Sequence, residues 1–194
     1  MKKYILFSFL LLGFLSFAQL REKGTTELIP TIGSATSIYY GTTNSLFYST
    51  PISSLNIGVQ GDYFYSSRWS LRSGLLFQTM GSQFPGYIEE LKYISVPVNA
   101  NWHFGSTRKW NLNFGPTLGL LTSATANGED VKSKANGFQY GLQVGIGYKL
   151  QLTDRFSILL DYQSMSGLSK VSKDSQNQIK NSYGSFDLGF VFKL

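Results

Sequence analysis

The sequence contains no cysteine, a single histidine and few charged residues, which make up 14% of its 194 positions. The lack of cysteine excludes disulfide bonds and thiolate metal sites. A soluble globular domain usually carries about 25% charged residues, so this composition favours a surface that faces something other than water. After the first residues, no apolar run reaches the roughly 20 residues of a membrane-spanning helix. A membrane location of the mature chain would therefore require a closed β-barrel.

Aromatic residues, in contrast, are abundant at 15% of the chain, and there are 20 glycines. This composition is typical of a β protein rather than of a helical soluble domain. The formal net charge is only +6. No basic stripe with interleaved aromatic residues occurs at the density that a phosphate-binding groove needs. We therefore expect no nucleic-acid partner.

The N-terminus has the three parts of an export signal. Two lysines precede an apolar run at residues 4–15, and small residues occupy positions −3 and −1 of a cut after Ala18. The alternative, a transmembrane anchor, needs roughly 20 apolar residues, and polar residues end this run too early. We therefore predict a cleaved signal peptide at residues 1–18 and a single domain at residues 19–194.

From residue 19 onward, the dominant sequence pattern has a period of two. In residues 138–150, apolar or aromatic side chains alternate with glycine, glutamine and lysine along the whole segment. Such alternation predicts strands, and about 10 residues are enough for a tilted strand to cross a bilayer. The eight predicted strands are residues 27–39, 55–65, 69–78, 93–104, 110–120, 138–150, 156–163 and 185–194.

The connections between these strands alternate in length. The short connections are residues 66–68, 105–109 and 151–155. The longer connections, rich in serine, threonine, asparagine, lysine or glycine, are residues 40–53, 82–90, 122–136 and 169–181. Short periplasmic turns at one end and long extracellular loops at the other are typical of outer-membrane barrels.

Alternation alone does not decide which face of the strands points outward. A soluble barrel of the lipocalin kind also has eight up-and-down strands, with its apolar face inward. Here the polar face carries small residues rather than the lysine and glutamate of a water-exposed surface. The apolar face carries Trp69, Trp102, Trp110 and Tyr148 near strand ends, as in membrane-interface girdles. We therefore predict an all-β fold, an eight-stranded antiparallel up-and-down transmembrane β-barrel with a filled, polar interior, in the outer membrane.

Two stretches of the sequence resemble a known family. Residues 91–98 (LKYISVPV) resemble its strand YIEIPLLLKY, and residues 113–119 (NFGPTLG) resemble its strand AGPYLGY. The chain is thus similar to the outer-membrane β-barrel family common in Bacteroidota, the PorT-like or "porin family" small barrels, over nearly its whole mature length. The resemblance implies the fold and a place in a Gram-negative cell envelope, but no single activity. One departure is the last residue, Leu194, where many such barrels have an aromatic.

Charged residues on the inward face predict an ion pair. Asp62 and Arg72 each lie five residues from Ser67, the centre of a short turn. In a hairpin, this symmetry places them opposite one another on neighbouring strands. An unpaired buried charge is costly, so we predict a cross-strand ion pair between them. The hypothetical network extends to three further inward residues, Lys149, Asp161 and Asp187. The alternative is that interior water solvates each group separately.

The sequence contains no pattern that indicates catalysis. A nucleophile, a base and an orienting group must come within reach, and the only histidine, His103, lies beside a short turn. We find no P-loop, Rossmann or metal motif, so we expect no cofactor and no metal. We predict a non-enzymatic barrel, a structural or interaction component of the cell envelope that binds partners through its loops or rim. The alternative is a narrow channel or a membrane-embedded enzyme acting on lipid.

The predicted partners are outer-membrane lipid and lipopolysaccharide, with an envelope protein as a further candidate. Lysines in the long loops suit anionic lipid head groups. The alternative is that they only keep the loops soluble. These lysines are Lys132, Lys134, Lys170, Lys173 and Lys180.

Overall fold

The computed structural model describes residues 22–41, 49–174 and 178–194. The predicted signal peptide at residues 1–18 lies outside the described residues. In the described part, a short 3-10 helix, η2 (Lys132–Lys134), lies in the connection after the fifth long strand. No helix in the described ranges has the length and apolar character needed to cross a membrane.

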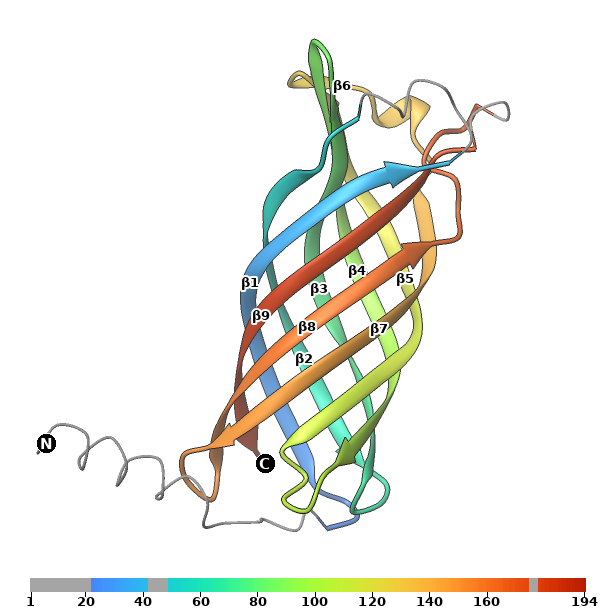
Figure 1. Cartoon of the computed structure of the whole chain (residues 1–194). Helices are drawn as coiled ribbons and strands as arrows, with labels where there is room; N and C mark the ends of the chain where they lie inside the picture. Colours follow the sequence, from blue (N-terminus) through green and yellow to red (C-terminus); the bar gives the residue numbers. More distant parts are fainter. Residues whose placement is uncertain (1–21, 42–48, 175–177) are drawn as a thin grey trace, which may run out of the picture.

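Eight long strands form a closed antiparallel barrel, as predicted (Figure 1). Consecutive barrel strands pair, and β1 also pairs with β9, so the wall has no free edge. A two-residue strand, β6 (Glu129–Asp130), folds back on the end of β5. The barrel strands are β1 (Thr26–Tyr40), β2 (Ile52–Phe64), β3 (Trp69–Phe84), β4 (Tyr87–Phe104), β5 (Trp110–Ala126), β7 (Phe138–Gln151), β8 (Phe156–Gly167) and β9 (Lys180–Lys193).

The apolar face of the strands points outward, which confirms the predicted orientation. On β7, Phe138 and Leu142 are 51% and 57% exposed, while Gln139 and Gln143 between and beside them are buried. Exposing apolar surface to water costs about 25 cal/mol per Å². A wall with large exposed apolar side chains on every strand therefore fits a lipid environment and not water.

We call the end of the barrel with connections 65–68, 105–109 and 152–155 the short-turn end, and the opposite end the loop end. Aromatic rings form a continuous row on the outer wall at the short-turn end. Trp69 and Trp102 stack with their ring centroids 6.2 Å apart, and Trp102 and Phe104 with theirs 5.0 Å apart. Phe104 then contacts Trp110, which meets Tyr148 edge to face. This row has the position and composition of an interfacial girdle.

The prediction of a long loop at residues 82–90 is wrong, because most of this segment belongs to strands β3 and β4. The hydrogen-bonded ladder between β3 and β4 continues to the pair Phe84 and Tyr87. The chain reverses within Pro85 and Gly86, whose φ of 91° suits glycine. Serine, glycine and proline made this stretch look like a loop, but pairing along β4 satisfies its backbone groups. The resulting hairpin rises above the rest of the barrel (Figure 1).

The predicted long loop at residues 122–136 is partly wrong for the same reason. Strand β5 continues to Ala126 and reverses at Asn127 and Gly128, whose φ values are 49° and 84°. An Asn-Gly pair with two positive φ angles is the preferred two-residue hairpin turn. Of the other two predicted loops, residues 42–48 and 175–177 lie outside the described residues.

Candidate functional site

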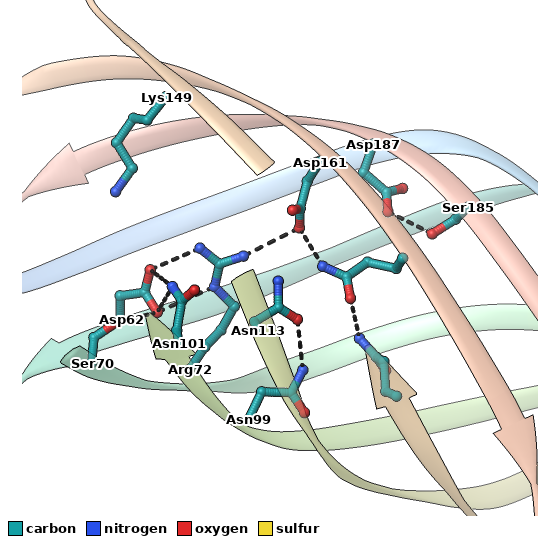
Figure 2. A network of polar contacts seen from close by, with 12 residues as sticks. Asp62, Ser70, Arg72, Asn99, Asn101, Asn113, Lys149, Asp161, Ser185 and Asp187 are labelled. Carbon is teal, nitrogen blue, oxygen red and sulfur yellow. Dashed lines mark hydrogen bonds and ion pairs between the residues drawn. The ribbon is translucent and has the colours of Figure 1, made fainter. Parts of the chain in front are cut away.

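The barrel interior near the short-turn end is organised around Arg72. Arg72 on β3 lies opposite Asp62 on β2, and its guanidinium meets that carboxylate with two nitrogens. Nε lies 3.2 Å from Asp62 Oδ1, and Nη2 lies 2.9 Å from Asp62 Oδ2. Across the interior, Nη1 lies 3.2 Å from Oδ2 of Asp161 on β8. One buried arginine thus links strands on opposite sides of the barrel (Figure 2).

Neutral side chains add further hydrogen bonds to the two carboxylates. Asn101 donates to both oxygens of Asp62 at 3.3 and 3.2 Å, and Ser70 donates to its Oδ1. Gln163 donates to Asp161 at 2.6 Å. A buried ion pair is stable only when such partners offset desolvation, so these neutral residues belong to the same structural unit.

The other predicted members of the network form neighbouring pairs. Lys149 forms a buried ion pair with Glu27, a residue that the sequence analysis did not single out. Asp187 accepts hydrogen bonds from Asn56 at 2.8 Å and Ser185 at 2.7 Å. No ion pair joins either group to Arg72 among the described residues. The five predicted residues therefore share one interior but divide into three polar units.

Asparagines occupy the interior beside Arg72. Asn99 donates to Asn113 at 3.1 Å, and both are fully buried. Several buried amide atoms here, including both of Asn111, have no protein partner in the described part of the chain. Ordered water usually satisfies buried polar groups of this kind. We therefore expect the interior to be hydrated at the level of these asparagines.

Toward the loop end, the interior also carries a cluster of apolar side chains, which the prediction of a polar interior did not include. We call this group the loop-end apolar cluster. Its buried members are Ala35, Tyr39, Met80, Phe84, Leu91, Tyr93, Leu121, Ala124, Ala135, Met165, Val171 and Tyr183. Ala135 and Val171 come from the segments between strands, so the cluster is closed from above by connecting chain. It fills the lumen together with buried polar residues such as Ser82, Gln139 and Asn181.

Two connections at the loop end are hydrogen-bonded to each other. Asn136, between β5 and β7, donates through its side chain to the carbonyls of Lys170 and Ser172 at 2.8 and 2.9 Å. Its backbone N–H donates to Val171. Lys173 donates its side chain to the carbonyl of Ser133. The two connections therefore form one ordered rim over the loop-end apolar cluster.

An Asn136→Ala variant is expected to loosen this rim without unfolding the barrel. The change removes two side-chain hydrogen bonds, each with a net contribution of about 1 kcal/mol. Trypsin should then cleave the two connections faster, while heat-modified gel mobility stays as in the wild type. Glu129→Gln, at an exposed position of the same connection, is the control. Equal cleavage rates in the two variants would show that Asn136 does not hold the rim.

A cavity of about 320 Å³ opens at the rim, above the loop-end apolar cluster. Its floor includes Tyr39, Ala135 and Val171, which also belong to that cluster. Its walls carry two charged residues, Glu89 and Lys134. The cavity thus combines an apolar floor with a few polar groups, the usual make-up of a small-molecule site.

The single histidine has a structural environment. His103 is 1% exposed, its Nε2 lies 3.0 Å from Ser70 Oγ, and its ring packs against Phe64 with centroids 4.7 Å apart. It thereby joins the hydrogen-bonded surroundings of Asp62. The residues that the structure describes contain no group of three or more His, Cys, Asp or Glu able to hold a metal ion.

Comparison with known families identifies the class of this barrel. The family described as outer membrane protein beta-barrel domain matches residues 18–173, which is most of the chain. The chain belongs to this family. Its location is accordingly the outer membrane, where the short-turn end of such a barrel faces the periplasm and the loop end faces outside. No curated protein matches the chain.

Several solved structures share the fold of this outer-membrane barrel. OprG from Pseudomonas aeruginosa has 11% identity and a TM-score of 0.58, over 89% of this chain and 97% of that one. Neisserial surface protein A has 16% identity and a TM-score of 0.55, over 87% and 97%. The outer membrane protein AlkL has 12% identity and a TM-score of 0.51, over 89% and 91%. At these identities the likeness concerns the fold alone.

Proposed function

We propose that this protein is a non-enzymatic structural or interaction component of the cell envelope, which binds its partner through the extracellular rim. The observation that carries the proposal is the contrast between a lumen filled at two levels and an ordered, hydrogen-bonded rim. We also propose that it belongs to the PorT-like group of Bacteroidota, on the strand similarities at residues 91–98 and 113–119.

The filled lumen argues against transport of solutes through the barrel. Arg72, Asp62 and Asp161 bridge the interior near the periplasmic end, and the loop-end apolar cluster fills it near the outside. An eight-stranded barrel has an interior just wide enough for side chains. With the lumen filled, the polar and aromatic side chains that a partner can reach lie at the rim.

The projecting hairpins of the rim offer a surface for a protein partner. The β3–β4 and β5–β6 hairpins are held together by Asn127, which exchanges hydrogen bonds with Ile88 at 2.9 Å and donates to the Gly86 carbonyl at 3.0 Å. Next to these hydrogen bonds of Asn127, the side chains of Tyr87 and Ile88 are 41% and 40% exposed. A rigid tip with exposed apolar and aromatic side chains fits a protein contact, because such residues dominate interface energetics.

The rim lysines support a secondary contact with lipopolysaccharide phosphates, the lipid partner of this proposal. Lys132 donates to the carbonyl of Thr122 at 2.8 Å, and Lys173 donates to that of Ser133. Both keep further N–H donors because an ammonium carries three. Their first role is to order the rim, so we place the protein contact at the hairpin tip and the lipid contact around it.

Site-specific photo-crosslinking in intact outer membranes tests the proposal. A photoreactive residue at position 87 or 88 is expected to crosslink to one partner protein in stoichiometric yield. Position 63, an exposed tyrosine on the outer wall at the periplasmic end, is the matched control and should not give this product. The absence of a specific product at positions 87 and 88, or the same product at position 63, would count against a partner at the tip.

Planar bilayer recordings test the filled lumen and the alternative of a narrow channel. Purified wild-type barrel is expected to give no steady ion conductance, because side chains fill the interior at two levels. Empty detergent is the blank. Steady, reproducible single-channel steps from the wild-type protein would favour the channel alternative, and turnover of added phospholipid by the purified barrel would favour the lipid enzyme.

A further inference from the structure

The cavity at the rim is lined by Glu89, whose carboxylate forms no ion pair with the residues that the structure describes. Glu89 comes from the part of β4 that projects beyond the lipid-facing belt, because its neighbours Glu90 and Lys92 are charged and exposed on the outer face. Charged residues are costly on the lipid face, so the belt ends below them. No described residue lies within ion-pair distance of the Glu89 carboxylate. Its charge is therefore available to a ligand in the cavity.

A second polar group points to a ligand at the same place. Tyr39 lines the cavity from β1 and is only 4% exposed. Its hydroxyl lies beside the Glu89 carboxylate and interacts with it, and it has no other hydrogen-bond partner among the described residues. A buried hydroxyl and a carboxylate that meet in this way hold each other in place. Tyr39 and Glu89 thus present one hydroxyl oxygen and one carboxylate to the same cavity.

The remaining walls define the size and character of the ligand. Ala126, Val131, Val171 and Ile179 supply apolar surface, and Tyr87 supplies a second aromatic ring. A volume of about 320 Å³ is at the small end of ligand sites, which span roughly 300–1,000 Å³. Aromatic rings next to a carboxylate favour an organic cation, since both the ring faces and the carboxylate attract positive charge.

We propose that the rim cavity binds a small organic ammonium compound with an apolar body, whose cationic nitrogen is held by Glu89 and Tyr39. The inference rests on the proposed function, because it takes the extracellular rim as the binding surface, and it names a small ligand of that rim. Lys134 also lines the cavity, but it lies in the exposed connection η2. Water and salt weaken its repulsion of a bound cation.

The proposed site has a defined pH dependence. Burial raises the pKa of the Glu89 carboxyl above its ordinary value. The groups that face it are Tyr39 on β1, Tyr87 and Tyr93 on β4, and Lys134 in η2. Because the charged carboxylate binds the ammonium, affinity should increase as pH rises through the Glu89 pKa and should be lost below it. Glu89→Gln should abolish this pH dependence.

Titration calorimetry of the full barrel in nanodiscs tests the proposal, with 2-phenylethylammonium as the probe. Glu89→Gln is expected to weaken binding about tenfold or more, the loss of one charge-assisted hydrogen bond. Tyr39→Phe should weaken it roughly threefold. Glu90→Gln makes the same change one residue away on the exposed outer face and should bind like the wild type. Heat-modified gel mobility verifies that each variant is folded.

Two neutral or anionic probes make the test specific for the cation. The uncharged 2-phenylethanol should bind more weakly than the ammonium and should not respond to Glu89→Gln, and 3-phenylpropionate should not bind. The proposal is overturned by equal ammonium binding in the wild type and Glu89→Gln, by no binding to the wild type at millimolar probe, or by a preference for the anion that Lys134→Gln removes. Photo-crosslinking at position 88, which does not line the cavity, reports the protein partner separately, so failure of one proposal is distinguishable from failure of the other.

Discussion

Replacing Arg72 with methionine is expected to destabilise the folded barrel by about 3–5 kcal/mol, the range found when one partner of a buried ion pair is removed. The change leaves the carboxylates of Asp62 and Asp161 in the interior without their cation, and each is almost fully buried. Urea unfolding in lipid, followed by tryptophan fluorescence, measures the free energy. Trp69, Trp102 and Trp110 on the outer wall provide the signal.

A matched control and a double variant separate charge from packing in this prediction. Arg155→Met makes the same substitution in an exposed connection at the periplasmic end and should change stability by about 0.5 kcal/mol or less. Asp62→Asn combined with Arg72→Met removes one of the two buried carboxylates that have lost their cation. The double variant should therefore be more stable than Arg72→Met alone. A loss below about 1 kcal/mol in Arg72→Met, or no recovery in the double variant, would mean that interior water solvates the carboxylates.

Introducing a single methyl group at Gly115 is expected to lower the free energy of unfolding by about 3 kcal/mol, the upper end of the range for overpacking. Gly115 lies close against the backbone of the neighbouring strand β4. A Cβ atom there would overlap the carbonyl oxygen of Val98 and lie 2.9 Å from the Cα of Asn99. These are backbone atoms of the neighbouring strand, so the wall itself would have to move. Gly115→Ala is measured by urea unfolding and by the folded fraction after heat-modified electrophoresis.

Gly119 offers the control for this prediction on the same strand and the same inward face. A Cβ atom at Gly119 would lie 3.3 Å from Ser95 Oγ and 3.4 Å from a ring carbon of Tyr93, both side-chain atoms that can adjust. Gly119→Ala should therefore change stability by less than about 1 kcal/mol. Equal effects at the two positions would mean that general strand propensity, and not backbone approach, decides the cost.

The ion pair between β2 and β3 could be anticipated because it depends only on local geometry. Asp62 and Arg72 lie at equal distances from one short turn, and hairpin register follows from turn position. The bond from Arg72 to Asp161 could not be anticipated, because β8 lies on the opposite side of the lumen. Which residues meet across a barrel depends on strand tilt and stagger, which no alternation pattern encodes.

The loop end shows where an alternation pattern misleads. Residues 82–90 combine serine, glycine and proline with apolar residues, a composition shared by loops and by strand ends. The structure extends β3 and β4 there because each provides the other's hydrogen bonds. The inward side chains of this extension, such as Phe84 and Leu91, then fill the lumen with apolar atoms. Glu89 became a site residue only once this extension brought it next to Tyr39 on β1.

The seam between β1 and β9 has a consequence for how the chain reaches its folded state. It joins residues from the two ends of the described chain, for example Thr31 with Gly189, so the ring of hydrogen bonds closes only when all eight long strands are present. Until that moment the backbone groups of two strand edges lack hydrogen-bond partners and cannot be placed in the lipid that the apolar outer wall needs. A pairing between segments so far apart in the sequence slows folding. Partial sets of strands therefore gain little stability, and insertion into the bilayer and closure of the ring are expected to occur as one cooperative event.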